Sequence, residues 1–118
     1  MRKMILATAI LAFSFCSSTW AWWPEVKNYK ELKAIETMRT FVEGVGRGLS
    51  IANAVMGSEI GGKLFCPPSS FALTVENYFH ILDEEIVRSE ETKGYDAVQK
   101  DPIDILLLYG LQNTFPCK

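Results

Sequence analysis

His80 is the only histidine of the chain, so a catalytic system in which an imidazole activates a serine or a cysteine would have to use it. It falls in the middle of a predicted helix, at the edge of an apolar face, and no free cysteine is expected to act with it. His80 and Glu84 are one helical turn apart and could share a metal ion, but two ligands do not make a site and the spacing suggests no third. We therefore predict a surface histidine, with no catalytic residue, no metal and no cofactor.

Three glycines, Gly44, Gly46 and Gly48, have the spacing of a phosphate-binding loop but not its context. The nucleotide-binding pattern follows a strand and opens a crossover helix, whereas helical periodicity precedes these glycines. Close packing is the simpler interpretation. Gly44, Gly48 and Ala52 are spaced four residues apart, so they would share one helix face and let another helix approach closely.

Acidic residues gather near the end of one predicted helix and in the connection after it. Such a run usually forms a solvated face, and a docking surface for a basic partner is the functional alternative. Paired carboxylates act as acid and base only in a cleft that gives them different environments, so this run does not predict catalysis and we expect no enzyme. The run consists of Asp83, Glu84, Glu85, Glu90 and Glu91.

Residues 1–21 have the pattern of a cleaved secretory signal. Arg2 and Lys3 are followed by the apolar residues 4–16, and residues 19–21 form a small-x-small cleavage site. The stretch is too short to span a bilayer. We predict that residues 22–118 form one exported domain in the periplasm, with no membrane attachment after cleavage.

The charge of the exported domain argues against nucleic acid as a partner. The full chain has 12 Lys and Arg against 14 Asp and Glu. Loss of Arg2 and Lys3 leaves ten basic residues against 14 acidic ones, a formal net charge of −4. Phosphate binding needs clustered basic residues, which this domain does not have.

Two cysteines remain after the signal is removed. Cys16 lies within the signal, and the Phe15 before it is not the small residue that a lipid-attachment signal needs. Cys66 and Cys117 form an even pair in an oxidising compartment, where a disulfide is the expected state. In the chain-entropy model, closing the loop of about 50 residues between them stabilises the fold by at most about 4 kcal/mol.

Helical periodicity dominates the N-terminal half of the domain. Apolar residues recur every three or four positions over residues 26–42, which predicts an amphipathic helix. Residues 49–56 predict a further helix, with a kink or break near residues 44–48. The glycines and prolines of residues 57–68 predict a loop that contains Cys66.

The C-terminal half predicts two more helices. Ser69 or Ser70 is expected to cap the clearest helix, which ends near Arg88. Residues 89–100 are polar and predict a loop or one loose turn, and Asp101 is expected to cap the last helix with Pro102 at its first position. Because no segment alternates with the period of a strand, the sequence predicts a small all-α domain of four to five helices with one disulfide.

Four motifs together resemble one known family. They are Phe41-x-x-Gly44-x-x-x-Gly48, Phe65-Cys66-x-Pro68, Val75-x-x-Tyr78-Phe79 and Leu107-x-x-Gly110-Leu111-x-x-x-Phe115-Pro116-Cys117. The chain resembles the Rap/Tai immunity proteins of type VI secretion over nearly all of residues 22–118. The family often has Ala where Gly110 stands, and Gly46 makes the glycine segment unusually loose.

The resemblance implies a function without catalysis. It implies a small helical periplasmic protein, disulfide-linked and commonly dimeric, that binds a peptidoglycan amidase effector and blocks its active-site groove. Such toxins cut the peptide stems of the cell wall with a Cys-His pair. An inhibitor of this kind needs a rigid scaffold, an element that enters the groove and complementary charge around it.

Two predicted loops could enter the toxin's groove. The first, residues 57–64, has Ser58 and Glu59 at its tip and is held by the Cys66 bridge, so it would lose less entropy on binding. The second, residues 89–100, is longer and more acidic, and we favour it slightly on charge. Its candidate partner-binding residues are Glu90, Glu91, Asp96 and the aromatic Tyr95.

A different functional class remains open. A periplasmic acid-stress chaperone of the HdeA-like type is also small, helical and held by one disulfide. Such a chaperone exposes apolar surface when its carboxylates are protonated, below their ordinary pKa values of about 4. Trp22 and Trp23 would stand at the new N-terminus, either docked on the core or exposed as an apolar patch.

Overall fold

Helices make up the fold, which the computed structural model describes for residues 23–118. Within that range it contains no strand, only an isolated bridge between Glu25 and Pro102, and no helix is long and apolar enough to cross a membrane. The predicted signal, residues 1–21, and Trp22 lie outside the described residues. The helices are α2 (Val26–Leu32), α3 (Glu36–Glu59), α4 (Val75–Lys93), α5 (Tyr95–Val98) and α6 (Ile103–Thr114). The predicted small all-α bundle with one disulfide is confirmed.

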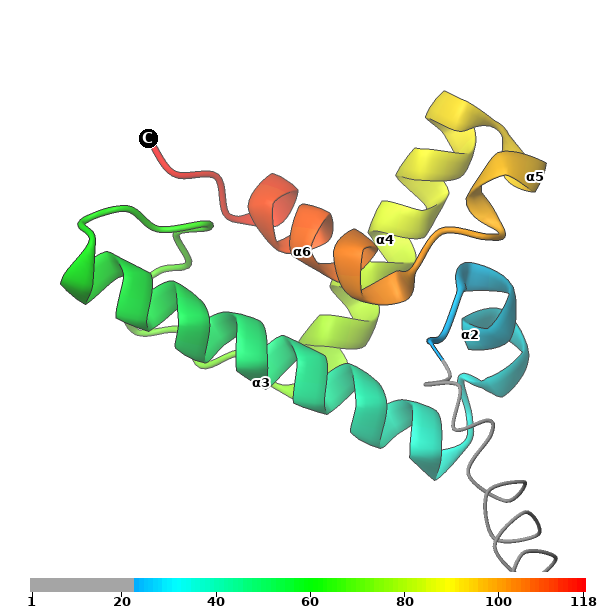
Figure 1. The fold of residues 1–118 in the computed structure, drawn as a ribbon, viewed down its shortest axis with the longest axis horizontal. Coiled ribbons are helices and arrows are strands. Elements are labelled where there is room, and N and C mark those ends of the chain that lie inside the picture. Colours follow the sequence, from blue (N-terminus) through cyan, green and yellow to red (C-terminus); the bar gives the residue numbers. More distant parts are fainter. Residues whose placement is uncertain (1–22) are drawn as a thin grey trace, which may run out of the picture.

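The helix α4 is the centre of the packing. It contacts α3 at its start, α6 along its middle and α5 at its end, and α2 lies beside α4 at the α5 end of the molecule. Figure 1 shows α3 running along the base and α6 crossing α4 above it. Apolar side chains from all five helices fill the space between them: Val26, Tyr29, Met38, Val42, Tyr78, Ile81, Leu82, Ile86, Val98, Ile103, Leu106, Leu107 and Leu111, with Phe65 from the connection after α3.

The first two described residues, Trp23 and Pro24, pack on the core. The Nε1–H of Trp23 donates to Asp104 Oδ1 at 2.9 Å, and its ring meets Phe41 edge-on with the ring centroids 6.4 Å apart. Behind it, Pro24 is buried and accepts a hydrogen bond from the backbone of Ile103. Trp23 therefore closes one end of the bundle, although about half of its surface stays exposed.

The single helix predicted over residues 26–42 is wrong. The helix is interrupted between Leu32 and Glu36, where Ile35 takes an extended conformation and becomes the N-cap of α3. Apolar periodicity runs through the break, yet Ile35 is 49% exposed and contributes little to the core. Tertiary packing decides this boundary, because α2 pairs with α4 near its C-terminal end whereas α3 packs near its start.

The break predicted near residues 44–48 is also wrong, since α3 is continuous for 24 residues. The predicted close approach exists, but at a different glycine. A Cβ atom on Gly46 would lie 2.5 Å from the ring of Tyr78, whereas Gly44 and Gly48 have no such atom within 4 Å. Helix α4 therefore packs against the glycine that sequence analysis read as loose.

The predicted start of α4 is wrong by four or five residues. Thr74, not Ser69 or Ser70, is the N-cap: its Oγ1 accepts from the N–H of Asn77, and the Asn77 side chain accepts from the N–H of Thr74 at 2.9 Å. This reciprocal pair is a capping box. Phe71, which the predicted helix would have included, lies before α4 and is 46% exposed.

The end of α4 and the start of α6 also differ from prediction. Helix α4 continues past Arg88 to Lys93, where Gly94 stops it with φ 93° and ψ 148°, a region that only glycine occupies readily. Pro102, not Asp101, is the N-cap of α6. Because Gly94 is the residue that breaks the helix, residues 89–93 are helical and not a loop.

Gly110 shows why α4 and α6 pack closely. A Cβ atom there would lie 2.7 Å from Cγ2 of Ile81 and 3.1 Å from its carbonyl oxygen. Glycine at this position lets the two helices approach more closely than alanine would.

Candidate partner-binding surface

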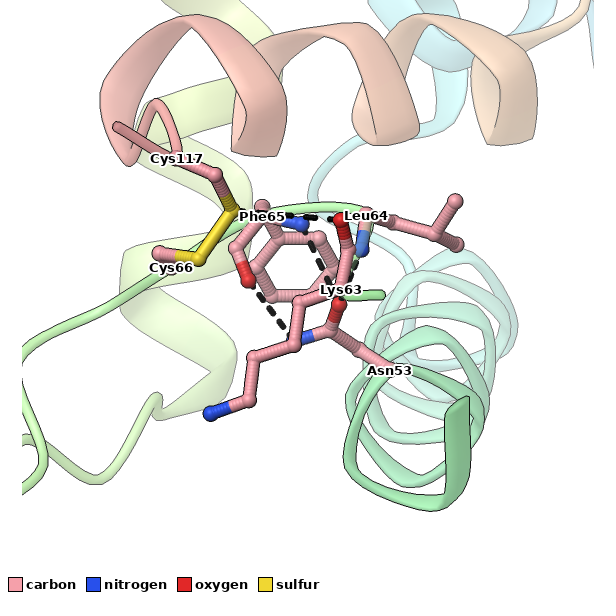
Figure 2. Close-up of a disulfide and its surroundings, with 6 residues drawn as sticks. All are labelled: Asn53, Lys63, Leu64, Phe65, Cys66 and Cys117. Atoms are coloured by element: carbon pink, nitrogen blue, oxygen red, sulfur yellow. Dashed lines mark hydrogen bonds between the residues drawn. A yellow bond between two sulfur atoms is a disulfide. The ribbon is translucent and has the colours of Figure 1, made fainter. Parts of the chain in front are cut away.

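The predicted disulfide between Cys66 and Cys117 is confirmed, with the two Cα atoms 5.0 Å apart. It joins the connection after α3 to the C-terminal residues after α6, as Figure 2 shows. Beside it, the N–H of Cys66 donates to the carbonyl of Phe115 at 2.8 Å. The connection is therefore fixed covalently and by the backbone at the same point.

Asn53 holds the same connection from the α3 side. Its Oδ1 accepts from the backbone N–H of Leu64 at 2.6 Å and of Phe65 at 3.1 Å, and its Nδ2 donates to the carbonyl of Phe65 at 2.8 Å. Figure 2 shows these bonds around the side chain of Asn53. Asn53 is buried, so its amide satisfies backbone groups that water does not reach. Sequence analysis missed this residue, because an asparagine within a helix gives no signal of its distant partners.

We call residues 60–74 the anchored segment. The Phe65 side chain sits in the core, and the Phe71 ring packs on Phe115 with the centroids 6.0 Å apart. Ile60, at the start of the segment and before these fixed points, is 76% exposed. The segment is thus held at several places along its length while it presents apolar side chains to solvent.

Ser58 and Glu59 do not form the tip of a loop, contrary to prediction. Both belong to the last turn of α3, and the hydroxyl of Ser58 donates to the carbonyl of Val55 at 3.0 Å. The helix continues past Gly57 to Glu59, and the aliphatic chain of Lys63 lies over Gly57, where a Cβ atom would be 2.7 Å from Lys63 Cε. Both residues are exposed at the base of the anchored segment.

The second predicted loop is helical. Glu90 and Glu91 belong to α4, and Tyr95 and Asp96 belong to α5. We call these four residues the acidic corner. They lie around Gly94, which turns the chain sharply between the two helices.

Part of the charge of the acidic corner is used within the molecule. Glu90 forms an ion pair with Lys30 of α2 and accepts from Gln99 Nε2 at 3.1 Å. The hydrogen bond from Lys30 lowers the pKa of Glu90 below its usual value, and the bond from Gln99 adds to the effect. The Lys30 ammonium also lies 4.6 Å from the ring centroid of Tyr95. Glu91 and Asp96 are not in this network.

The rest of the acidic run is not one solvated face. Glu85 is buried and accepts from Arg88 at 2.5 Å and from Asn113 at 2.9 Å. Asp83 accepts from the Tyr29 hydroxyl at 2.7 Å and forms an ion pair with Lys33 of the turn after α2. Burial, together with this hydrogen bond, raises the pKa of Tyr29. The run therefore holds neighbouring helices together, which leaves less of it to dock a partner.

His80 is exposed and lies 3.2 Å from Glu84 Oε1 on the outer face of α4. Among residues 23–118 no three histidine, cysteine or acidic side chains gather closely enough to hold a metal ion. The pair stands alone on the surface, so this geometry offers neither a nucleophile beside the imidazole nor a third metal ligand.

The two candidate surfaces lie at opposite ends of the molecule. Figure 1 shows the C-terminal end of α3 at the left and α5 at the upper right beside the end of α4, with α6 between them. They cannot form one continuous contact around a narrow groove. Comparisons with known protein families, curated proteins and solved structures find no match to this chain.

Proposed function

We propose that this protein is an immunity protein of the Rap/Tai type, which binds a cognate type VI peptidoglycan amidase effector in the periplasm and occludes its active site. The observation that carries the proposal is the anchored segment. It is fixed at Asn53 and at the Cys66–Cys117 bridge, and it exposes Ile60 and Phe71. A segment that is already ordered loses little conformational entropy when it enters an enzyme groove.

The anchored segment supports the proposal better than the acidic corner does. At the acidic corner, Glu90 is committed to Lys30 and Gln99, so a partner would have to break those contacts. At the anchored segment, Ile60 and Phe71 have apolar surface to bury, and the exposed Glu59, which precedes Ile60 in the chain, can meet a cation. Apolar anchors surrounded by charge are the usual composition of an interface that binds tightly.

The test is a reconstitution with wall-cutting enzymes. The mature, tagged protein is used to capture partners from the organism's own periplasmic and secreted fractions, and each captured protein is assayed for peptidoglycan digestion. We expect recovery of one amidase, silenced by a stoichiometric amount of this protein. Recovery of no wall-cutting enzyme, or of one that stays active at saturation, would contradict the proposal.

Matched variants then locate the contact. Ile60→Glu places a charge on the anchored segment, and Ile105→Glu places the same charge at another exposed isoleucine, on α6. We expect only Ile60→Glu to weaken inhibition, by 100-fold or more, because a buried unpaired charge is costly at an interface (about 3 kcal/mol or more). Equal inhibition by both variants would show that the anchored segment is not part of the contact.

Sedimentation of the free protein tests the expected homodimer.

A second candidate function rests on a separate observation. Three ion pairs tie α2, the turn after it and the start of α3 to α4, and protonation would break each of them: Lys30–Glu90, Lys33–Asp83 and Arg39–Glu76. An acid-stress chaperone would expose the apolar faces beneath α2 in this way. Light scattering of an aggregating client at pH 2 and at pH 7 separates the two functions, since only a chaperone suppresses aggregation of unrelated clients at acid pH.

A further inference from the structure

A groove of about 610 Å³ lies between α3 and the anchored segment. Ile51 of α3 and Phe71 of the anchored segment stand on its two sides, and both are largely exposed. Tyr78 of α4 lies at its floor, where its ring packs against Gly46. The groove is therefore built from three different parts of the chain, and its lining combines polar side chains with apolar ones.

The floor carries a pair of hydroxyl groups. Ser50 Oγ and Tyr78 Oη are 2.9 Å apart, and either one can be the donor. Two hydroxyl groups have two hydrogens, and the bond between them uses one. The second hydrogen is free to be donated to an occupant of the groove.

The rim of the groove carries only positive charge. Arg47 and Lys63 line it, and no aspartate or glutamate does. Arg47 also pairs with Glu43 at 2.8 Å, one turn back along α3 and outside the groove. The Lys63 ammonium has no carboxylate within 4.0 Å among residues 23–118.

Two further polar side chains line the groove, the hydroxyl of Ser69 and the amide of Asn53. The side-chain amide of Asn53 is already hydrogen-bonded to the backbone of Leu64 and Phe65. The side-chain charge that the groove offers is thus cationic, and its hydroxyl pair has a spare donor. An occupant must supply carboxylates and carbonyl oxygens to these donors and an apolar side chain to the walls.

We propose that this groove binds an extended acidic segment of a partner protein. A carboxylate of that segment meets Lys63 and Arg47, and an adjacent apolar side chain packs between Ile51 and Phe71. The partner and this protein then interlock, because the anchored segment enters the partner while the partner's acidic segment lies behind it. Assigning that segment to the amidase rests on the proposed function, whereas the chemistry of the groove does not.

Peptide titration tests the groove without any toxin. The probe is a blocked five-residue peptide of alternating aspartate and leucine, and the control is the same peptide with lysine in place of aspartate. Each is added at millimolar concentration to the isotope-labelled mature protein, and amide shifts are followed by NMR. We expect the acidic peptide alone to shift the amides around Ser50, Lys63 and Phe71.

Two substitutions of lysine give the matched comparison. Lys63→Met removes the ammonium and keeps the aliphatic chain that covers Gly57, so the fold is preserved. Lys27→Met makes the same change at an exposed lysine of α2, away from the groove. We expect Lys63→Met to weaken binding of the acidic peptide at least fivefold and Lys27→Met to leave it unchanged.

Several outcomes would overturn the proposal. One is the absence of groove shifts with the acidic peptide, and another is equal shifts with the two peptides. A third is the same set of shifts from inorganic phosphate alone, which would make the groove a simple anion site. If the peptide binds but no amidase is captured or inhibited, the groove proposal stands and the proposed function fails. If an amidase is inhibited but the peptide does not bind, the proposed function stands and the groove proposal fails.

Discussion

The anchored segment and the acidic corner look alike in sequence and differ in structure. The anchored segment overlaps the predicted loop of residues 57–64, and the acidic corner lies within the predicted loop of residues 89–100; these are the two loops that were expected to enter a toxin. In the folded protein residues 60–74 are irregular and held by Asn53 and a disulfide, whereas Glu90, Glu91, Tyr95 and Asp96 lie in helices around one turn at Gly94. The anchored segment is ordered by contacts with other parts of the chain, whereas the acidic corner is ordered by the helices to which its residues belong.

The difference lies in what each region leaves available to a partner. At the acidic corner the helix satisfies the backbone, and Lys30 and Gln99 occupy Glu90. At the anchored segment the fixing contacts are made by Asn53, Phe65 and Cys66, which face inward, so Ile60 stays exposed. Rigidity and an unused surface occur together in the anchored segment, and this combination favours binding.

The sharpest way to break the comparison is to remove the disulfide. The double variant Cys66→Ala/Cys117→Ala frees the anchored segment from the C-terminal residues and leaves the acidic corner untouched. We expect the free energy of unfolding to fall by up to about 4 kcal/mol, from the loop-closure entropy. Urea unfolding followed by circular dichroism measures it, with dithiothreitol-treated wild type as the control. An unchanged midpoint would show that Asn53 and Phe65 hold the segment without the bridge.

The second prediction concerns the hydrogen bonds of Asn53. Asn53→Ala leaves two N–H groups and one carbonyl of the anchored segment without partners, which costs on the order of 3 kcal/mol. Asn113→Ala is the control, because that amide makes one hydrogen bond, to Glu85. We expect the larger loss for Asn53→Ala by urea unfolding, with faster hydrogen exchange at Leu64 and Phe65. Equal losses of unfolding free energy in the two variants would show that Asn53 does not fix the segment.

The fold class and the disulfide were predictable from sequence because they depend on features that a sequence states directly. Helical periodicity and an even pair of cysteines need no knowledge of distant contacts. The N-cap of α4 was also within reach, because Thr74-x-x-Asn77 carries the spacing of a capping box. Ser69 and Ser70 drew the prediction away because they follow two prolines, where a helix start is common.

The candidate site was less predictable, because distant partners define it. Asn53 and Phe65 meet only when α3 and the anchored segment are placed side by side, and Glu85 reads as a surface charge until α6 brings Asn113 beside it. Gly44 and Gly48 share the four-residue spacing of a packing face, yet the rotation of α3 turns Gly46 toward α4. No local pattern records that rotation.

The third prediction tests the packing of α3 on α4, which supports both the anchored segment and the groove. Gly46→Ala forces a methyl group into the Tyr78 ring, and overpacking of this kind costs about 1–3 kcal/mol. Gly48→Ala makes the same change at an open position of the same helix, where alanine gains up to about 1 kcal/mol of helix propensity. We expect opposite shifts of the thermal midpoint. Two shifts of the same sign would mean that α3 is rotated differently on α4.

The smallest expected effect belongs to the acidic corner and is a pH dependence. The hydrogen bond from Lys30 lowers the pKa of Glu90 in the folded protein below its unfolded value. The pair therefore contributes stability above the unfolded pKa, and this contribution is lost as the pH falls through the folded pKa. Partly exposed pairs are worth at most about 1 kcal/mol. We expect Glu90→Gln to be less stable than wild type at pH 7 in urea unfolding, and the difference to shrink as the pH is lowered below the unfolded pKa of Glu90. Glu91→Gln, outside the Lys30 network, should match wild type in stability at pH 7; if it loses as much as Glu90→Gln, the acidic corner acts through general charge and not through this pair.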